Sequence, residues 1–187
     1  MGADKTVGVV TSGKETSKTT TTEDALLNEW NKMEFSWLRV ARSQMGVSEV
    51  PGSGNSKQVL EYHATTTLKA TQDSVPWCSS FVNWCMEQAG YRGTKSAAAA
   101  SWLSYGSECG EFKPHGSIVI LKRKGGNHVG FLVGSDQFNV YLLGGNQADA
   151  VNIRPFAHSL VRGYVLPKEL NDDDDLVFEF QLRHGVA

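Results

Sequence analysis

Long hydrophobic runs and an excess of one charge are both missing from this sequence. No apolar stretch approaches the roughly 20 residues that a membrane-spanning helix needs. The 187 residues include 18 basic and 20 acidic side chains, which leaves a formal net charge of −2. Such a chain has no general attraction to nucleic acid or to anionic membranes. The sequence therefore predicts neither a membrane span nor nucleic-acid binding.

Cysteine is scarce, and its positions form no recognisable framework. The three cysteines, Cys78, Cys85 and Cys109, are an odd number at unequal spacings, and no C-x-x-C pair is available for zinc. We therefore predict no disulfide scaffold, no metal site and no cofactor.

An apolar signal-peptide core is missing from the first 22 residues. We expect the protein to be made in the cytoplasm. If it acts on the cell-wall side, we expect it to leave by a non-Sec route or by lysis.

The composition is that of one globular domain with a tail at either end. Hydrophobic residues make up 40% and charged residues 20% of the chain. Residues 1–24 are rich in Thr, Ser, Gly and Lys and are predicted to form a flexible leader. We assign residues 25–168 to the folded domain. Residues 169–187 are expected to hold an acidic linker at Asp172–Asp175 and a strand or tail at Val177–Leu182, whose apolar residues alternate.

The hydrophobic period changes along the domain. Apolar residues recur at helical spacing in the first half, which predicts helices near residues 26–41, 57–63, 78–89 and 97–105. Beyond Gly116, short apolar runs separated by glycine turns predict strands near residues 117–121, 128–133, 139–143, 151–153 and 162–166. Helices followed by strands predict an α+β domain, with helices packed on an antiparallel sheet of about five or six strands.

Cys78 occupies the point where a proline-containing loop becomes helical, in the run V-P-W-C-S-S-F-V. A thiol in the first turn of a helix feels the positive end of the helix dipole, which lowers its pKa and favours the nucleophilic thiolate. The alternative is that Cys78 is a small buried apolar residue, as most free cysteines are.

A cysteine nucleophile needs a base, and five histidines are available. His128 is the best placed, because it opens a strand directly after the turn Gly125-Gly126-Asn127. A residue there lies at a sheet end, which a helix N-terminus can face. A purely structural role for His128 remains the alternative.

The base needs a third group that orients its ring. Asn146 follows two glycines at the end of the next strand, so its side-chain oxygen is the predicted partner of His128, with a turn-forming role as the alternative. The backbone N–H of Cys78 is the predicted first oxyanion donor. Weaker candidates for oxyanion or substrate contacts are Gln72, Tyr62, Trp77 and Gln147.

Taken together, these features resemble the NlpC-type and CHAP-type branch of papain-like peptidases. The resemblance runs from about residue 30 to Pro167 and departs at Pro114-His115-Gly116-Ser117, where the branch usually has Pro-Gly-Asp. The matching blocks occur in order: Trp37-Leu38 with Ala41, Gly46, Glu49, Gly52 and Asn55; Pro76-Trp77-Cys78-Ser79 with Phe81-Val82-Asn83-Trp84; Ser101-Trp102-Leu103 with Gly106; Gly116-Ser117-Ile118-Val119; His128-Val129-Gly130-Phe131; and Gly144-Gly145-Asn146-Gln147.

The resemblance implies a papain-like fold and hydrolysis of an amide bond in bacterial peptidoglycan. The bond would lie within the stem peptide or between muramic acid and L-alanine. Cys78 would be the nucleophile, His128 the base and Asn146 its orienting residue. It also implies a monomer acting as a phage-type lysin or as an antibacterial effector, for example of type VI secretion, with a secretion carrier or an immunity protein as partners.

Two other functions remain compatible with the sequence. The first keeps the fold and changes the substrate, giving a papain-like protease or deamidase that acts on proteins. The second is a catalytically inactive relative that binds the cell wall.

Overall fold

The computed structural model of the protein describes residues 33–185. The predicted leader, residues 1–24, and the first part of the helix predicted near residues 26–41 lie outside this range. Within it, no helix combines the length and the apolar character needed to cross a membrane.

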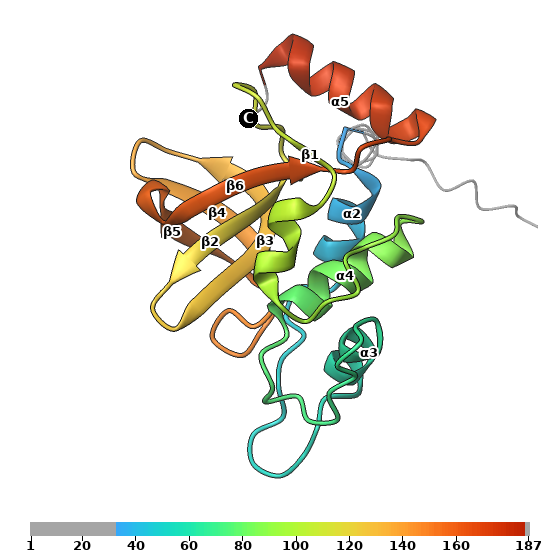
Figure 1. The fold of residues 1–187 in the computed structure, drawn as a ribbon, viewed down its shortest axis with the longest axis vertical. Helices are drawn as coiled ribbons and strands as arrows, with labels where there is room; N and C mark the ends of the chain where they lie inside the picture. The colour runs from blue at the N-terminus through green and yellow to red at the C-terminus, as the bar shows by residue number, and fades with distance from the viewer. Residues whose placement is uncertain (1–32, 186–187) are drawn as a thin grey trace, which may run out of the picture.

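Six antiparallel strands form one sheet in the order β1-β6-β2-β3-β4-β5, which confirms the predicted α+β class and strand number (Figure 1). Hairpins join β2 to β3 and β3 to β4, as the glycine turns predicted. The strands are β1 (Ser107–Glu108), β2 (Ile118–Arg123), β3 (Gly126–Ser135), β4 (Asn139–Gly144), β5 (Asn152–Ala157) and β6 (Val161–Leu166).

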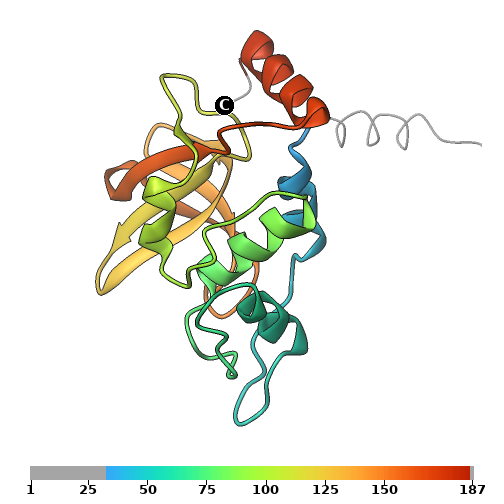
Figure 2. The same cartoon turned by 45° about the vertical axis from the view of Figure 1, so that its right-hand side comes forward.

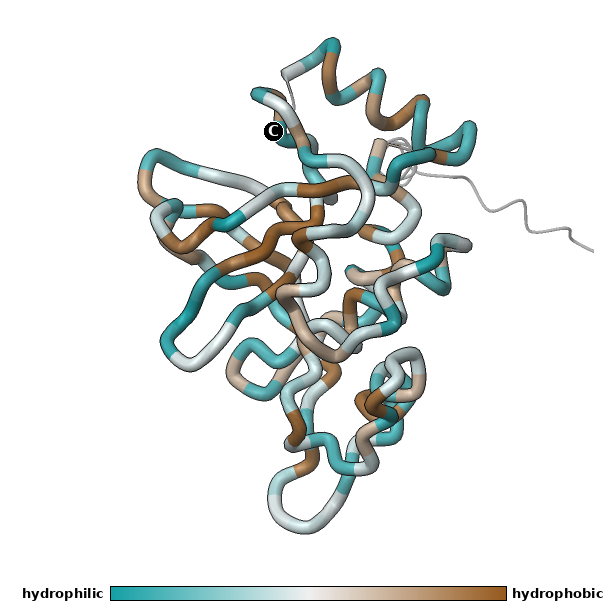
Figure 3. Tube along the Cα trace, viewed as in Figure 1, coloured by the Kyte–Doolittle hydropathy of each residue, from teal (hydrophilic) through white to brown (hydrophobic). Residues whose placement is uncertain are grey.

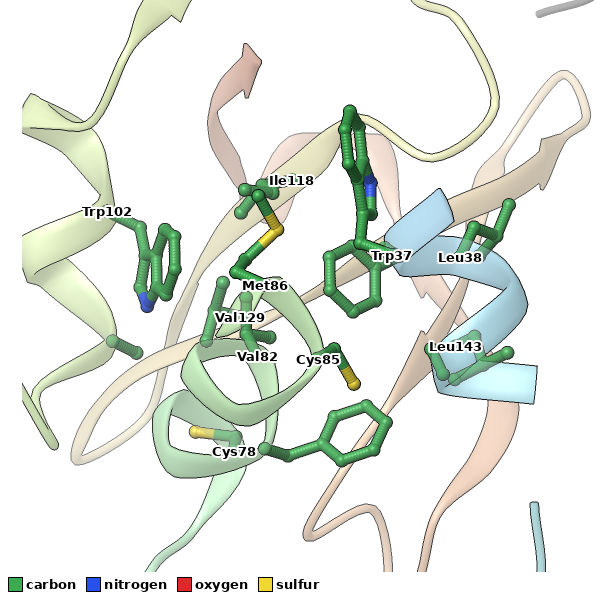
Figure 4. Close-up of a cluster of buried hydrophobic side chains, with 14 of the residues drawn as sticks. Trp37, Leu38, Cys78, Val82, Cys85, Met86, Trp102, Ile118, Val129 and Leu143 are labelled. Carbon is green, nitrogen blue, oxygen red and sulfur yellow. The ribbon is translucent and has the colours of Figure 1, made fainter. Parts of the chain in front are cut away.

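The helices before the sheet gather on one side of it, with α4 next to the strands (Figures 1 and 2). They are α2 (Ser36–Ser43), α3 (Lys57–Ala64), α4 (Cys78–Gln88) and the short 3₁₀ helix η1 (Ala99–Ser104). A second 3₁₀ turn, η2 (His158–Leu160), connects β5 to β6. Figure 4 shows α4 enclosed between side chains of α2, such as Trp37, and Trp102 of η1.

Each face of the sheet carries its own apolar cluster, because side chains alternate along a strand. Val129 and Phe131 of β3 belong to the cluster shared with the helices, whereas Leu132 belongs to a cluster on the opposite face. The sheet strands accordingly contain the most hydrophobic stretches of the chain (Figure 3). His128 has the same parity as Leu132, so its side chain lies on the face away from α4.

The C-terminal segment differs from its prediction. Asp172–His184 forms a helix, α5, where an acidic linker and a strand at Val177–Leu182 were expected. The Asn171 side chain caps the helix by accepting a hydrogen bond from the backbone N–H of Asp174. Four carboxylates in the first turn stabilise the helix further, because they lie at the positive end of its dipole. Asp174, Val177 and Gln181, spaced three and four residues apart, are the buried positions, so burial follows the helical period although the sequence alternates.

Candidate active site

Cys78 is the first residue of α4, at the position that the sequence predicted. The loop before it is held by Asp73, whose carboxylate accepts the backbone N–H groups of Val50 and Ser56 at 2.9 and 2.8 Å. In return, the backbone N–H of Asp73 donates to Asn55 Oδ1 at 2.9 Å. These bonds fix the segment that leads the chain into the nucleophile.

The predicted thiolate is not supported by the surroundings of Cys78. The side chain is only 8% exposed, and burial raises the pKa of the thiol. The backbone N–H groups of Val129 and Ser79 and the charge of Arg123 act in the opposite direction but do not outweigh burial. Burial therefore overcomes the helix dipole, and at neutral pH Cys78 is a thiol that needs a base.

His128 provides a base of suitable protonation state. Its ring is 2% exposed, and burial lowers its pKa to about 4, helped by the charge of Arg123 and opposed by a hydrogen bond to Gln147. At pH 7 the imidazole is therefore neutral. The backbone N–H of Val129, the next residue along β3, is the one that approaches the sulfur of Cys78. The β3 backbone beside His128 thus contacts Cys78, whereas the imidazole lies on the other face of the sheet, and no hydrogen bond found within residues 33–185 joins the two side chains.

Gln147, and not Asn146, orients the histidine. The distance from His128 Nε2 to Gln147 Oε1 is 3.0 Å. The Gln147 amide nitrogen donates to the carbonyl oxygens of Leu142 and Asn152 at 3.2 and 2.6 Å. Carbonyl oxygens only accept, so these two bonds identify the nitrogen end of the amide and leave Oε1 facing the ring. His128 Nε2 must then carry the proton, and Nδ1 is the basic nitrogen.

Asn146 has the turn-forming role that was the alternative to contacting His128. Its φ is +56°, a left-handed conformation that asparagine tolerates better than most residues. Among the hydrogen bonds found within residues 33–185, none links its side chain to His128. Both polar residues follow the two glycines in the sequence. The turn brings Gln147, instead of Asn146, to the His128 ring.

The two glycines before Asn146 allow the start of α4 to approach the end of β4 closely. A Cβ on Gly145 would lie 2.5 Å from the Trp77 ring and 2.7 Å from Phe81 Cβ. A Cβ on Gly144 would lie 3.0 Å from Gln147 Oε1. The absence of side chains here lets the start of α4 meet the end of β4, beside the oxygen of Gln147.

Tyr62 and Trp77, two of the weaker candidates, use their polar atoms elsewhere. The Tyr62 hydroxyl donates to Gln44 Oε1 at 2.9 Å, and its ring packs against Trp77 in the core. Trp77 donates its indole N–H to Glu49 Oε1 at 2.8 Å. Gln72 is exposed in the loop before α4. The backbone N–H of Cys78 remains the predicted oxyanion donor.

Arg123 is a site residue that the sequence did not indicate. Its charge acts on both Cys78 and His128, and its guanidinium lies 5.9 Å from the centre of the Phe156 ring. The same ring lies 5.4 Å from the imidazole. Arg123 is at the end of β2, which pairs with the start of β3, and only that pairing places it beside the histidine.

A pocket of about 360 Å³ opens beside Gln147. A larger one, about 420 Å³, lies under α5 around Cys109 and contains none of the predicted catalytic residues. No group of three or more His, Cys, Asp or Glu side chains in residues 33–185 is arranged to hold a metal ion.

The chain was compared with curated proteins and with solved structures. No curated protein matches the sequence. Among solved structures, the peptidoglycan hydrolase RipB from Mycobacterium tuberculosis is similar with a TM-score of 0.48 and 18% identity, over 87% of this chain and 75% of that one. The P60 domain of an antigen from M. avium paratuberculosis gives a TM-score of 0.43 and 14% identity, over 76% and 97%.

The family comparison covers the centre of the site. Residues 70–146 match the CHAP domain family. This range includes Cys78, His128 and Asn146, and it stops one residue before Gln147. The match confirms the CHAP-type resemblance of the sequence over residues 70–146.

Proposed function

We propose that this protein is a cysteine hydrolase that cleaves amide bonds in bacterial peptidoglycan. The observation that carries the proposal is that Cys78, at the start of α4, contacts the β3 backbone next to His128, whose imidazole tautomer is set by the network around Gln147. The CHAP match supplies the substrate class, because the CHAP-type enzymes that the sequence resembles act on peptidoglycan.

The reaction begins from two neutral groups. His128 Nδ1 takes the proton of the Cys78 thiol as the sulfur attacks the scissile carbonyl carbon. The backbone N–H of Cys78 donates to the oxyanion that forms. Gln147 Oε1 accepts from Nε2 throughout, which stabilises the imidazolium while it exists.

Collapse of the intermediate releases the amine and leaves a thioester. His128 Nδ1 returns its proton to the leaving nitrogen, so that the C–N bond breaks and the C–S bond remains. His128 then takes a proton from water, the resulting hydroxide equivalent attacks the thioester, and the thiol is regenerated as a carboxylic acid is released. No redox step or cofactor enters this scheme.

Digestion of purified sacculi tests the proposal. We expect the wild-type protein to release soluble muropeptides and Cys78→Ala to release none, with both proteins showing the same thermal unfolding. Mass spectrometry of the products identifies the bond as one within the stem peptide or the muramoyl–L-alanine amide. Intact sacculi together with cleavage of a protein substrate would instead favour a protease. Equal release by both proteins would contradict cysteine catalysis.

We further propose that the enzyme acts on the cell-wall side, as an antibacterial effector or as a phage-type lysin. An effector would need a secretion carrier and an immunity protein in the producing cell. Expression with an added periplasmic signal should lyse cells in a manner that depends on Cys78, whereas cytoplasmic expression should not. Co-purification from the producing cell of a protein that abolishes muropeptide release would distinguish the effector from the lysin.

A further inference from the structure

The pocket beside Gln147 has a basic lining. Its walls are formed by Arg123, Gln147, Ala148, Arg154, Pro155 and Phe156. Gln147 is also the residue that holds His128. The pocket therefore adjoins the hydrogen-bonded pair of Gln147 and His128.

Strand pairing explains why the two arginines lie together on this side. Arg123 is two residues beyond Leu121, which pairs with His128, so Arg123 lies on the histidine's face of the sheet. Arg154 of β5 pairs with Leu142, whose side chain belongs to the apolar cluster of that same face. The end of β2, the turn after β4 and the middle of β5 thus surround one pocket.

Within the described part of the chain, no carboxylate forms a salt bridge with either guanidinium. The salt bridges found within residues 33–185 involve Arg42, Lys95 and Arg183, and none reaches Arg123 or Arg154. Arg123 instead lies near the Phe156 ring, a contact that leaves its N–H donors available. Two planar cationic groups that form no salt bridge within residues 33–185 are suited to bidentate binding of a carboxylate.

We propose that Arg123 and Arg154 bind a carboxylate of the substrate beside the scissile amide. The inference rests on the proposed function, since it names the part of the peptidoglycan stem peptide that the site recognises. Stem peptides carry free carboxylates at their glutamyl residue and at their C-terminus. The net charge of −2 gives the protein no general affinity for anions, so recognition depends on this local pair.

Binding of two matched peptides tests the proposal. The probes are N-acetylated L-Ala-γ-D-Glu-L-Lys-D-Ala-D-Ala and the same peptide with both carboxylates converted to amides. Affinities are measured calorimetrically with the Cys78→Ala protein, so that nothing is cleaved. We expect the free acid to bind at least about tenfold more tightly than the amide, and this ratio to fall with added salt.

The arginine variants, made in the Cys78→Ala protein, identify the residues responsible. Each single variant, Arg123→Gln or Arg154→Gln, should reduce the ratio of the affinities for the acid and the amide to within about threefold. The main cause should be weaker binding of the acid. Arg92→Gln is the matched control, because Arg92 is exposed beyond the far end of α4 and should leave the ratio unchanged.

Several results would overturn the proposal. These are equal affinity for the two peptides, no measurable binding of either, or a ratio that survives in the Arg123→Gln, Arg154→Gln double variant. Digestion of sacculi by the wild-type protein is scored separately. If the peptides are distinguished as expected but sacculi stay intact, the carboxylate site stands and the proposed hydrolysis fails. If sacculi are digested and the peptides are not distinguished, the reverse holds.

Discussion

At the scale of single residues, the site depends on which way one amide points. Gln147 is 2% exposed, and its nitrogen is committed to the carbonyls of Leu142 and Asn152. Its oxygen can therefore only accept the proton of His128 Nε2. This single orientation sets the tautomer of the base, and with it the nitrogen that activates Cys78.

Substitution of Gln147 and of Asn146 should have very different effects on kcat. Gln147→Ala should lower kcat by about 100-fold, because the ring loses its tautomer and its orientation, and general acid–base catalysis contributes about 10²- to 10⁴-fold. Asn146→Gly should keep kcat within about threefold, since glycine adopts the positive φ of this turn without strain. Muropeptide release at saturating sacculi measures both. A larger loss for Asn146→Gly than for Gln147→Ala would restore Asn146 as the orienting residue.

The sequence predicted that Cys78 begins a helix and that Asn146 contacts His128; the helix begins as predicted, and Gln147, one position later, makes the contact. Spacing after a strand locates a polar turn, but the turn's dihedral angles decide which side chain reaches back to the sheet. The lowered thiol pKa was wrong for a related reason, because the helix dipole is visible in sequence whereas burial of Cys78 is not. Arg123 gave no local signal, as its place beside His128 arises from pairing between strands.

At the scale of elements, the junction between α4 and β4 requires Gly145. In Gly145→Ala the new methyl group would overlap the Trp77 ring and Phe81, so α4 must move away from the strand end. We expect about 1–3 kcal/mol of destabilisation from overpacking, together with reduced kcat because Cys78 moves with the helix. Urea unfolding and muropeptide release measure the two effects. Gly110→Ala, where an added Cβ meets nothing within 4 Å, should change neither.

The buried carboxylate of Asp174 connects the last helix, α5, to the domain by hydrogen bonds. Asp174 is fully buried and accepts hydrogen bonds from the Ser36 backbone N–H and hydroxyl, from the Tyr91 hydroxyl and from the Asn171 amide. It therefore ties α5 to the start of α2 and to the segment after α4. The sequence showed four equivalent aspartates, and only the docked helix distinguishes this one.

Replacing that carboxylate should destabilise the protein strongly. Asp174→Ala leaves several buried donors without an acceptor, and we expect a loss of about 3 kcal/mol in the free energy of unfolding. Asp173→Ala, at an exposed position in the same helical turn, should lose less than about 1 kcal/mol through the dipole alone. Equal losses in urea titrations would show that the helix terminus, and not the buried network, holds α5.

At the scale of the whole molecule, the buried His128 couples stability to pH. Above pH 6.5 the ring is neutral in both the folded and the unfolded chain and contributes no pH dependence. Between pH 6.5 and about 4 the unfolded chain binds a proton that the folded chain does not, so stability falls as the solution is acidified. Each pKa unit corresponds to about 1.4 kcal/mol, which gives a loss of about 3 kcal/mol by pH 4.

Urea unfolding at pH 7 and pH 4 measures this loss, with His128→Gln as the comparison. The variant should lose about 3 kcal/mol less than the wild type over that interval. His63, also buried with a lowered pKa, acts in the same direction and remains in both proteins. An identical pH dependence in the two proteins would mean that His128 titrates normally in the folded state.

Burial of the cysteines also determines how readily their thiols react with oxidants. Peroxide and alkylating reagents react with exposed thiolates, and burial raises the pKa of Cys78, Cys85 and Cys109 alike. Cys78 therefore stays in its unreactive thiol form, and in the proposed mechanism it loses its proton only to His128 during attack on an amide. At the proposed place of action on the cell-wall side, burial would protect Cys78 against sulfenic acid formation and against disulfide exchange without any added reductant.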